Sequence, residues 1–178
     1  MADPRIPRNA RRAALRRMTL AGVLTAAAFF LSYLEAILPF SVGIPGVKLG
    51  LCHIAVVFAL YRLSVWETAA ITAVRVILSA LLFGSVASLA YSVAGAVLSL
   101  VVMLVLRRIR VRGKEAFSPL GVSVAGGVAH NLGQMLAAAC LMQTAALALY
   151  LPVLLVAGAC TGALVGLVGG ILVSRVRV

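Results

Sequence analysis

The chain has 178 residues, of which 63% are hydrophobic and 11% are charged, and its formal net charge is +12. An ordinary soluble domain is about 45–50% apolar and about 25% charged, so this composition excludes a soluble globular fold. The basic residues flank apolar runs instead of gathering on one polar surface, which argues against nucleic-acid binding. The length allows about six spans of about 20 residues, so we expect an all-α polytopic protein embedded in a lipid bilayer.

Six segments are apolar enough to be membrane-spanning helices. They follow a basic stretch, residues 1–17, which we expect to be a cytoplasmic tail preceding one transmembrane domain over residues 18–178. A basic stretch before an apolar run also resembles a signal peptide, but several equally apolar segments follow, which favours a first transmembrane helix. The predicted spans are residues 18–38, 47–62, 66–84, 86–106, 119–143 and 148–174.

The first predicted span carries an acidic residue and a small-residue surface. Glu35 should lie near its outer end, and Gly22 with Ala26 forms a surface that another helix can approach closely. The segment that follows, Pro39 to Lys48, contains two prolines and two glycines. We expect it to be a structured outer loop that could cover a cavity.

The second predicted span is the shortest and could instead be tilted or re-entrant. It contains His53, which is more often a packed residue than a ligand contact. The cysteines Cys52, Cys140 and Cys160 lie in apolar stretches, where we expect packing and no disulfide framework.

The basic residues predict the orientation, because Lys and Arg concentrate in cytoplasmic loops. With both termini in the cytoplasm, 14 of the 16 basic residues fall on the inner side of the cell membrane. The exceptions are Lys48, near the outer end of the second span, and Arg75. Arg75 lies roughly 13 Å along the third span, close to the middle of the bilayer. A charge at that depth costs about 2.5–3.5 kcal/mol on insertion scales, so it should face a cavity or a partner.

Polar side chains recur at helical spacing on several spans, and together they predict a polar cavity that opens outward. Arg75 continues a stripe of hydroxyl side chains on the third span, and the fifth span carries imidazole and amide groups. A purely structural network is the alternative, in which Glu35 neutralises a basic residue and the hydroxyls bond to their own helices. The candidate ligand-binding residues are Glu35, Lys48, Arg75, His130, Asn131 and Gln134.

Glycines recur every fourth residue on the last span, at Gly158, Gly162, Gly166 and Gly170. This spacing lets another backbone approach closely, either within the chain or in a partner protein.

The sequence lacks the patterns of several enzyme classes. It has no G-x-x-x-x-G-K-[ST] phosphate loop, so any energy should come from another subunit or an ion gradient. Its four acidic residues include a single aspartate and form no cluster that could hold magnesium and a diphosphate. We therefore expect neither catalysis nor a cofactor or metal site.

Three stretches form a recognisable pattern, and the third is the most specific. They are Pro45–Leu51, Val74–Leu78 continuing to Phe83 and Gly84, and Ser118–Ser123 continuing to Ala129–Gln134. Together they resemble the Gx transporter family, often labelled heptaprenyl diphosphate synthase component I, over about residues 15 to 174. That family is similar to the S components of energy-coupling factor (ECF) transporters, which are six-helix membrane proteins that capture a nutrient from outside.

The resemblance implies partners and a main function. An S component associates with a membrane T component and two ATPase subunits, and it docks through an alanine-x-x-x-alanine pattern on its first helix. Gly22 and Ala26 come nearest to that pattern here. Our main hypothesis is an S-component-like subunit that binds a small polar or anionic ligand.

Two other functions stay open. The family label implies a non-catalytic accessory subunit for isoprenoid or quinone synthesis. The third possibility is a stand-alone, ion-coupled carrier in which Glu35 responds to protons.

Overall fold

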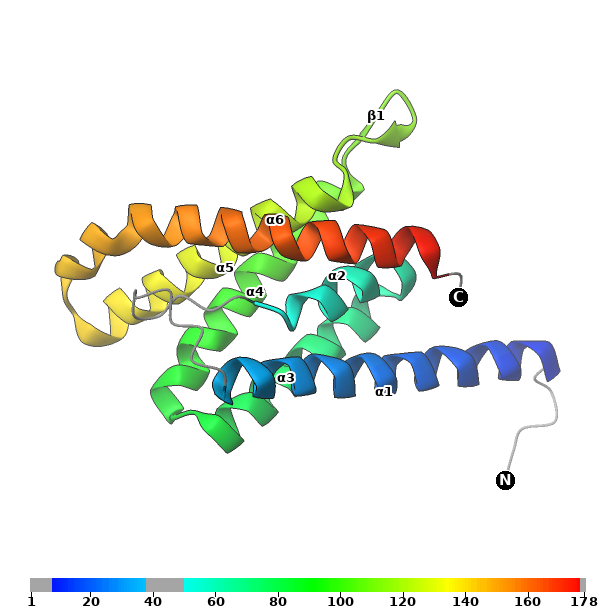
Figure 1. The fold of residues 1–178 in the computed structure, drawn as a ribbon, viewed down its shortest axis with the longest axis horizontal. Helices are drawn as coiled ribbons and strands as arrows, with labels where there is room; N and C mark the ends of the chain where they lie inside the picture. The colour runs from blue at the N-terminus through cyan, green and yellow to red at the C-terminus, as the bar shows by residue number, and fades with distance from the viewer. Residues whose placement is uncertain (1–7, 38–49, 177–178) are drawn as a thin grey trace.

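The structure is a computed structural model that describes residues 8–37 and 50–176 of the chain. In this part of the chain, helices pack side by side, some of them crossing the others obliquely, and a small hairpin projects from one end (Figure 1). The elements in order are α1 (Arg8–Ile37), α2 (His53–Arg62), α3 (Val65–Phe83), α4 (Val86–Arg108), β1 (Arg110–Val111), β2 (Lys114–Glu115), α5 (Pro119–Met142), the 3-10 helix η1 (Ala145–Tyr150) and α6 (Leu151–Arg175).

The chain is an all-α polytopic membrane protein. In the described residues, α1, α3, α4, α5 and α6 are long and apolar enough to cross a bilayer. Four of the predicted spans, those that became α3 to α6, agree with the structure to within three residues at each end. Hydroxyl side chains explain several of the starts, because Ser64, Ser85 and Ser118 each cap the first turn of the helix that follows.

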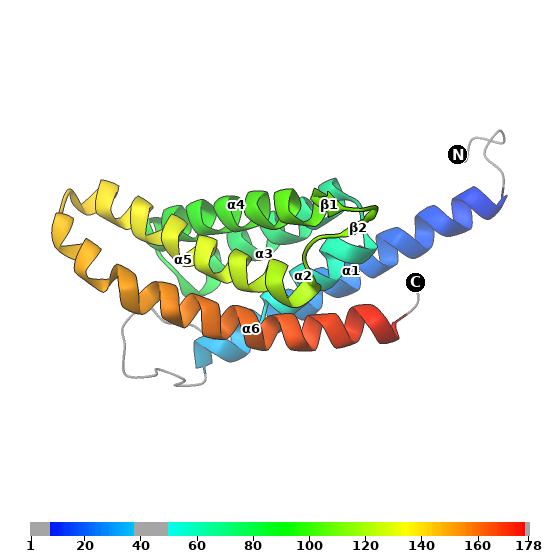
Figure 2. The ribbon, with the colours of Figure 1, turned by 90° about the horizontal axis from the view of Figure 1, so that it is seen from above.

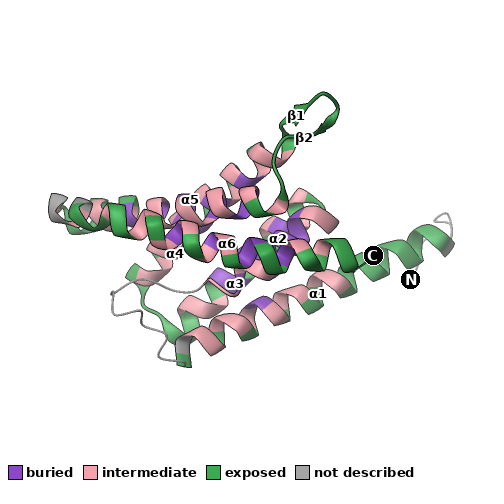
Figure 3. Ribbon diagram, turned by 45° about the horizontal axis from the view of Figure 1, so that its top comes forward, coloured by how far each residue is buried: buried purple, intermediate pink, exposed green. Residues whose placement is uncertain are grey.

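The second predicted span was wrong in extent. Of residues 47–62, residues 47–49 lie outside the described residues, and α2 begins only at His53 and has 10 residues. Such a helix is about 15 Å long, whereas the hydrocarbon core of a bilayer is about 30 Å thick. The short helix is nevertheless among the most buried parts of the protein (Figure 3). The expected loop from Pro39 to Lys48 lies outside the described residues.

The first predicted span was also wrong at its start, because α1 begins at Arg8 and has 30 residues. A helix of that length measures about 45 Å, which exceeds the apolar thickness of a bilayer. Residues 8–17 of the basic stretch that we expected to be a cytoplasmic tail therefore continue the helix beyond the apolar segment. Among the candidate spans, α1 is also the least buried.

Helix α2 lies inside the bundle, against α1, α3 and α6. Its buried side chains Val56, Val57 and Leu60 join a core cluster with Met103 of α4, Val122 of α5 and Val165 of α6. On the opposite side, Leu20, Ala21 and Leu24 of α1 pack against the cluster of Ala59, Leu63 and Ile71.

The glycines of α6 pack within the chain. A methyl group placed at Gly162 would lie 2.7 Å from the Ser123 carbonyl oxygen, and one at Gly158 would lie 2.8 Å from the Gly127 carbonyl oxygen. Distances of this kind leave no room for a side chain, so α5 and α6 touch backbone to backbone. The close approach that the glycine spacing predicted is thus made to α5.

The two ends of the described helices differ in charge. The start of α1, the end of α6 and the hairpin lie at one end, as both views show (Figures 1 and 2). The hairpin turns at Arg112 and Gly113, whose φ angles of 52° and 81° are those of a tight two-residue turn. We call this the basic end, because most of the described arginines lie there.

Candidate functional site

A cavity of about 450 Å³ lies in the middle of the bundle, and each of the six described α-helices contributes to its wall. Five of the six candidate ligand-binding residues line it: Glu35, Arg75, His130, Asn131 and Gln134. Lys48, the sixth, lies outside the described residues. Gly22 and Ala26 are exposed on α1, away from the cavity.

Arg75 is the buried cation of this cavity, with only 7% of its surface exposed. Its Nη1 donates a hydrogen bond to the Cys52 sulfur at 2.9 Å. Its Nε and Nη2 are buried and have no hydrogen-bond partner among the described residues. Because each unpaired donor in a dry environment costs free energy, this guanidinium is suited to an anionic partner inside the cavity.

Glu35 joins α1 to the segment that leads into α2. Its carboxylate accepts a hydrogen bond from the backbone N–H of Gly50. The carbonyl of Gly50 in turn accepts from the backbone N–H of His53 at 2.8 Å. Gly50 has a φ of +68°, a conformation that favours glycine. Glu35 therefore faces the same cavity as Arg75 and also holds the entry to α2.

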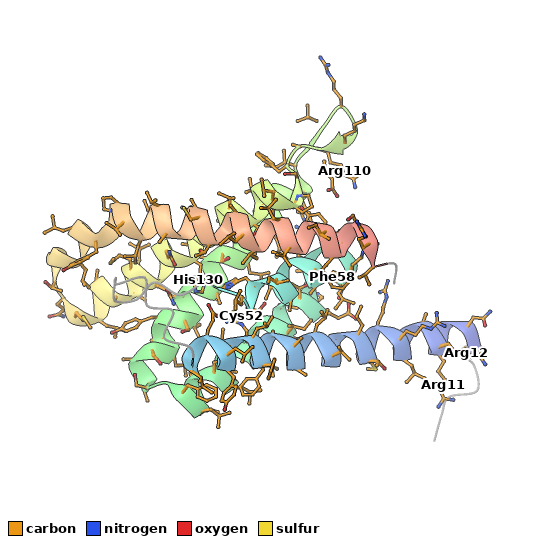
Figure 4. The ribbon with its side chains drawn as sticks, in the orientation of Figure 1. Arg11, Arg12, Cys52, Phe58, Arg110 and His130 are labelled. Carbon is orange, nitrogen blue, oxygen red and sulfur yellow. The ribbon has the colours of Figure 1, made fainter. Side chains whose placement is uncertain are left out.

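The two histidines meet at the cavity wall. The rings of His53 and His130 lie 4.8 Å apart between centroids, edge to face, and the Cys52 sulfur lies 3.5 Å from the His53 Nδ1. Figure 4 shows Cys52 and His130 in the middle of the bundle. Together with the bond from Arg75 to Cys52, these contacts bring α3, the start of α2 and α5 together at the cavity wall.

The amide residues of α5 have packing partners as well as a place in the cavity wall. Asn131 donates its side-chain N–H to the Leu154 carbonyl of α6 at 2.7 Å. Gln134 packs against Gly95 of α4, where an added methyl group would lie 2.7 Å from the Gln134 Cγ. Asn131 therefore also ties α5 to α6.

Hydroxyl groups in the cavity wall and on the inner face of α3 differ in their hydrogen-bond partners. Ser32, Thr68 and Thr72 donate to carbonyls one turn earlier on their own helices, as the structural alternative expected. Ser79 and Ser99 line the cavity with buried hydroxyls that have no partner among the described residues. This second set adds donors and acceptors to the cavity wall that a polar ligand or water can use.

Sequence reasoning missed Cys52 as a partner of Arg75. We expected Cys52 to be a simple packing residue, and the two residues lie 23 positions apart. Nothing in either segment alone indicates that the two side chains meet. His53 does pack, as expected, but it also lines the cavity.

The wall of this cavity carries groups that can hydrogen-bond to a polar or negatively charged group. Among the described residues, no three His, Cys, Asp or Glu side chains come together as metal ligands. The wall instead offers guanidinium and hydroxyl donors together with imidazole and amide groups. A few such polar groups in a concave site can orient a ligand through hydrogen bonds.

A family model described as heptaprenyl diphosphate synthase component I matches residues 24–172 of the chain. No curated protein and no solved structure matches.

Proposed function

The chain belongs to the heptaprenyl diphosphate synthase component I family, and we propose that it captures a small anionic or strongly polar ligand in its central cavity. In this proposal it serves as the substrate-binding component of an ECF-type transporter. One observation carries the proposal: two buried guanidinium nitrogens of Arg75 at the cavity have no partner among the described residues. The link to ECF transporters rests on the sequence resemblance.

An anionic group on the ligand would resolve the cost of burying Arg75. A charge at this depth is tolerated when a partner or a water-filled space receives it. The sulfur of Cys52 is only a weak acceptor, so it does not neutralise the guanidinium. A carboxylate or phosphate oxygen would accept from the two remaining nitrogens in the forked geometry that arginine favours.

The other candidate residues would then orient the ligand. In this proposal His130, Asn131 and Gln134 supply hydrogen bonds from α5, and Glu35 limits how negative a ligand can be near the α1 side. Lys48 would add a second positive charge. The cavity of about 450 Å³ is in the size range of small-molecule sites.

The binding test compares variants of the purified, reconstituted protein. Mass spectrometry first identifies what co-purifies, and affinity for that compound is then measured for Arg75→Met and for Arg110→Gln. We expect Arg75→Met to weaken binding about 10- to 100-fold, since hydrogen bonds to a charged group are worth about 1.5–3 kcal/mol. Arg110→Gln changes an exposed residue of the hairpin and should bind as the native chain does. Unchanged affinity in Arg75→Met would remove the guanidinium from the site.

Transport in this proposal requires partners, a T component and two ATPases, and α1 offers a surface for them. Gly22 and Ala26 are exposed, and a methyl group added at Gly22 would meet no atom within 4 Å. An open small-residue face of this kind permits close approach of a helix from another subunit.

A second candidate function is a non-catalytic accessory subunit for isoprenoid or quinone synthesis, favoured by the description of the matching family. Affinity purification in mild detergent separates the two. Recovery of a T component with ATPases supports transport, whereas recovery of a prenyl synthase supports the accessory role.

A further inference from the structure

A second and more open hollow, of about 520 Å³, lies at the surface of the basic end, far along α1 from the central cavity. We call it the arginine pocket. Five of its wall residues come from the start of α1 and two from the end of α2. They are Asn9, Arg12, Ala13, Arg16, Arg17, Tyr61 and Arg62.

The arginines of α1 are directed to this pocket by helical periodicity. Residues 9, 12, 13, 16 and 17 follow the three- and four-residue spacing of one helix face. The same face continues into Leu20, Ala21 and Leu24, which pack on α2 and α3. Arg11 is exposed on the same turn of α1 but does not line the pocket. Figure 4 shows the part of α1 that carries Arg11 and Arg12.

The α2 side of the pocket is fixed by contacts to neighbouring helices, and some of its donor groups have no hydrogen-bond partner among the described residues. Arg62 donates through Nη2 to the Val173 carbonyl of α6, and its Nε is buried without a partner among the described residues. The Arg107 guanidinium lies 5.0 Å from the centre of the Tyr61 ring. The buried Tyr61 hydroxyl likewise has no partner in the described part of the chain.

Charge around the pocket is strongly positive. Three arginines of α1 and one of α2 share it, and the first turn of α1 contains no acidic residue. The amino end of a helix is itself the positive end of its dipole. Glu67, an acidic residue near Arg17, is already bonded to Ser64 in the cap of α3. Glu115 also lies close enough to act on Tyr61, so two carboxylates are near the pocket. An anion bound there would offset the repulsion that remains among the four arginines.

The location of the pocket indicates a lipid. It lies where α1 passes from its arginine-rich turns into its apolar part, beside the exposed side chains of Leu15 and Met18. A soluble phosphate would gain nothing from these apolar side chains, whereas acyl chains would cover them. Lipid headgroups lie at this boundary, and basic pockets between helices at the cytoplasmic surface are suited to anionic ones.

We propose that the arginine pocket binds the phosphate of an anionic phospholipid, whose acyl chains then lie along α1. The guanidinium groups of Arg12, Arg16 and Arg17 surround the phosphate oxygens, and the Tyr61 hydroxyl and Arg62 Nε donate from the α2 side. This proposal is independent of any ligand in the central cavity.

The test uses the full chain in neutral detergent, with native mass spectrometry titrating phosphatidylglycerol and, separately, phosphatidylcholine. We expect phosphatidylglycerol to bind at least about tenfold more tightly. Arg16→Gln should weaken its binding about tenfold, and Tyr61→Phe, which removes a single oxygen, should weaken it severalfold. Arg11→Gln, the matched control, removes the same charge from the same helix outside the pocket and should have little effect.

Several outcomes would overturn the proposal. Equal losses in Arg11→Gln and Arg16→Gln would indicate diffuse attraction to a basic surface. Binding of inorganic diphosphate or farnesyl diphosphate without binding of phosphatidylglycerol would assign the pocket to a different phosphate. If Arg16→Gln does not fold, binding of phosphatidylglycerol is compared between Tyr61→Phe and the native chain. Unchanged binding in Tyr61→Phe would refute the proposed hydrogen bond from the Tyr61 hydroxyl to the phosphate.

Discussion

At the scale of single residues, burial separates two kinds of polar side chain. Thr68 and Thr72 bond to their own helix and need nothing else. Arg75 cannot do so, because five donor hydrogens on one guanidinium exceed what its helix offers. Its bond to Cys52 is therefore a tertiary contact between α3 and the residue before α2.

Replacing Cys52 should lower stability because it removes a partner from a buried charge. We expect Cys52→Ala to lower the melting temperature in detergent, with a cost of about 1–3 kcal/mol for the donor left unpaired. Cys52→Ser keeps an acceptor and should recover part of the loss. The control is Cys160→Ala, at an exposed position of α6. Equal melting temperatures for Cys52→Ala and Cys160→Ala would show that the sulfur contributes nothing to Arg75.

At the scale of elements, small residues are used differently on α6 and α1. On α6, Gly158 and Gly162 bring the backbone against α5 inside the chain. On α1, Gly22 lies on an open face that the described chain does not cover. Glycine therefore allows close packing against α5 within the chain on α6, whereas on α1 it lies on a surface that no described helix contacts.

Adding one methyl group should distinguish these two helices. Gly162→Ala would place a carbon 2.7 Å from the Ser123 carbonyl oxygen and 2.8 Å from the Val124 Cα. Since backbone atoms must move, we expect a loss of about 1–3 kcal/mol, read as a lower melting temperature. Gly22→Ala meets no atom and should hold or raise stability, because alanine favours helix over glycine by about 1 kcal/mol. If Gly22→Ala lowered the melting temperature and Gly162→Ala left it unchanged, the close backbone contact between α5 and α6 would be refuted.

At the scale of the whole molecule, the two ends of α2 meet different surroundings. Its first residue, His53, lines the central cavity, whereas Tyr61 and Arg62 at its other end line the arginine pocket. Helix α2 is thus the short, buried element that separates a polar interior from a basic surface. The hairpin, the start of α1 and the end of α6 all lie toward that basic surface (Figure 2).

The positive-inside rule predicts that the basic end faces the cytoplasm. Arg110 is exposed on the hairpin, so Arg110→Cys can be labelled there in a chain that also carries Cys140→Ala and Cys160→Ala. We expect a membrane-impermeant maleimide to label inside-out vesicles and to leave intact cells unlabelled. The same chain with Arg110 retained measures any labelling of Cys52. Labelling of intact cells at position 110 would show that the basic end faces outward, opposite to this prediction.

Local patterns determined much of this protein from sequence alone. Apolar length and helical spacing predicted α3 to α6 closely, and the polar stripe through Arg75 was correctly expected to face inward, since Thr68, Thr72 and Arg75 are buried. These properties depend on residues three or four apart, so one segment contains all the information required. That five of the candidate residues line one cavity also followed from the cost of polar groups in a bilayer.

Only the tertiary structure decided how distant segments meet. The sequence did not place the start of α2 at His53, and it missed the extension of α1 back to Arg8 because arginines, and not apolar residues, carry the helical spacing there. The pairing of Arg75 with Cys52 and the arginine pocket each join separate elements. Contacts of this kind arise from the relative position of packed helices, which no single stretch of the sequence encodes.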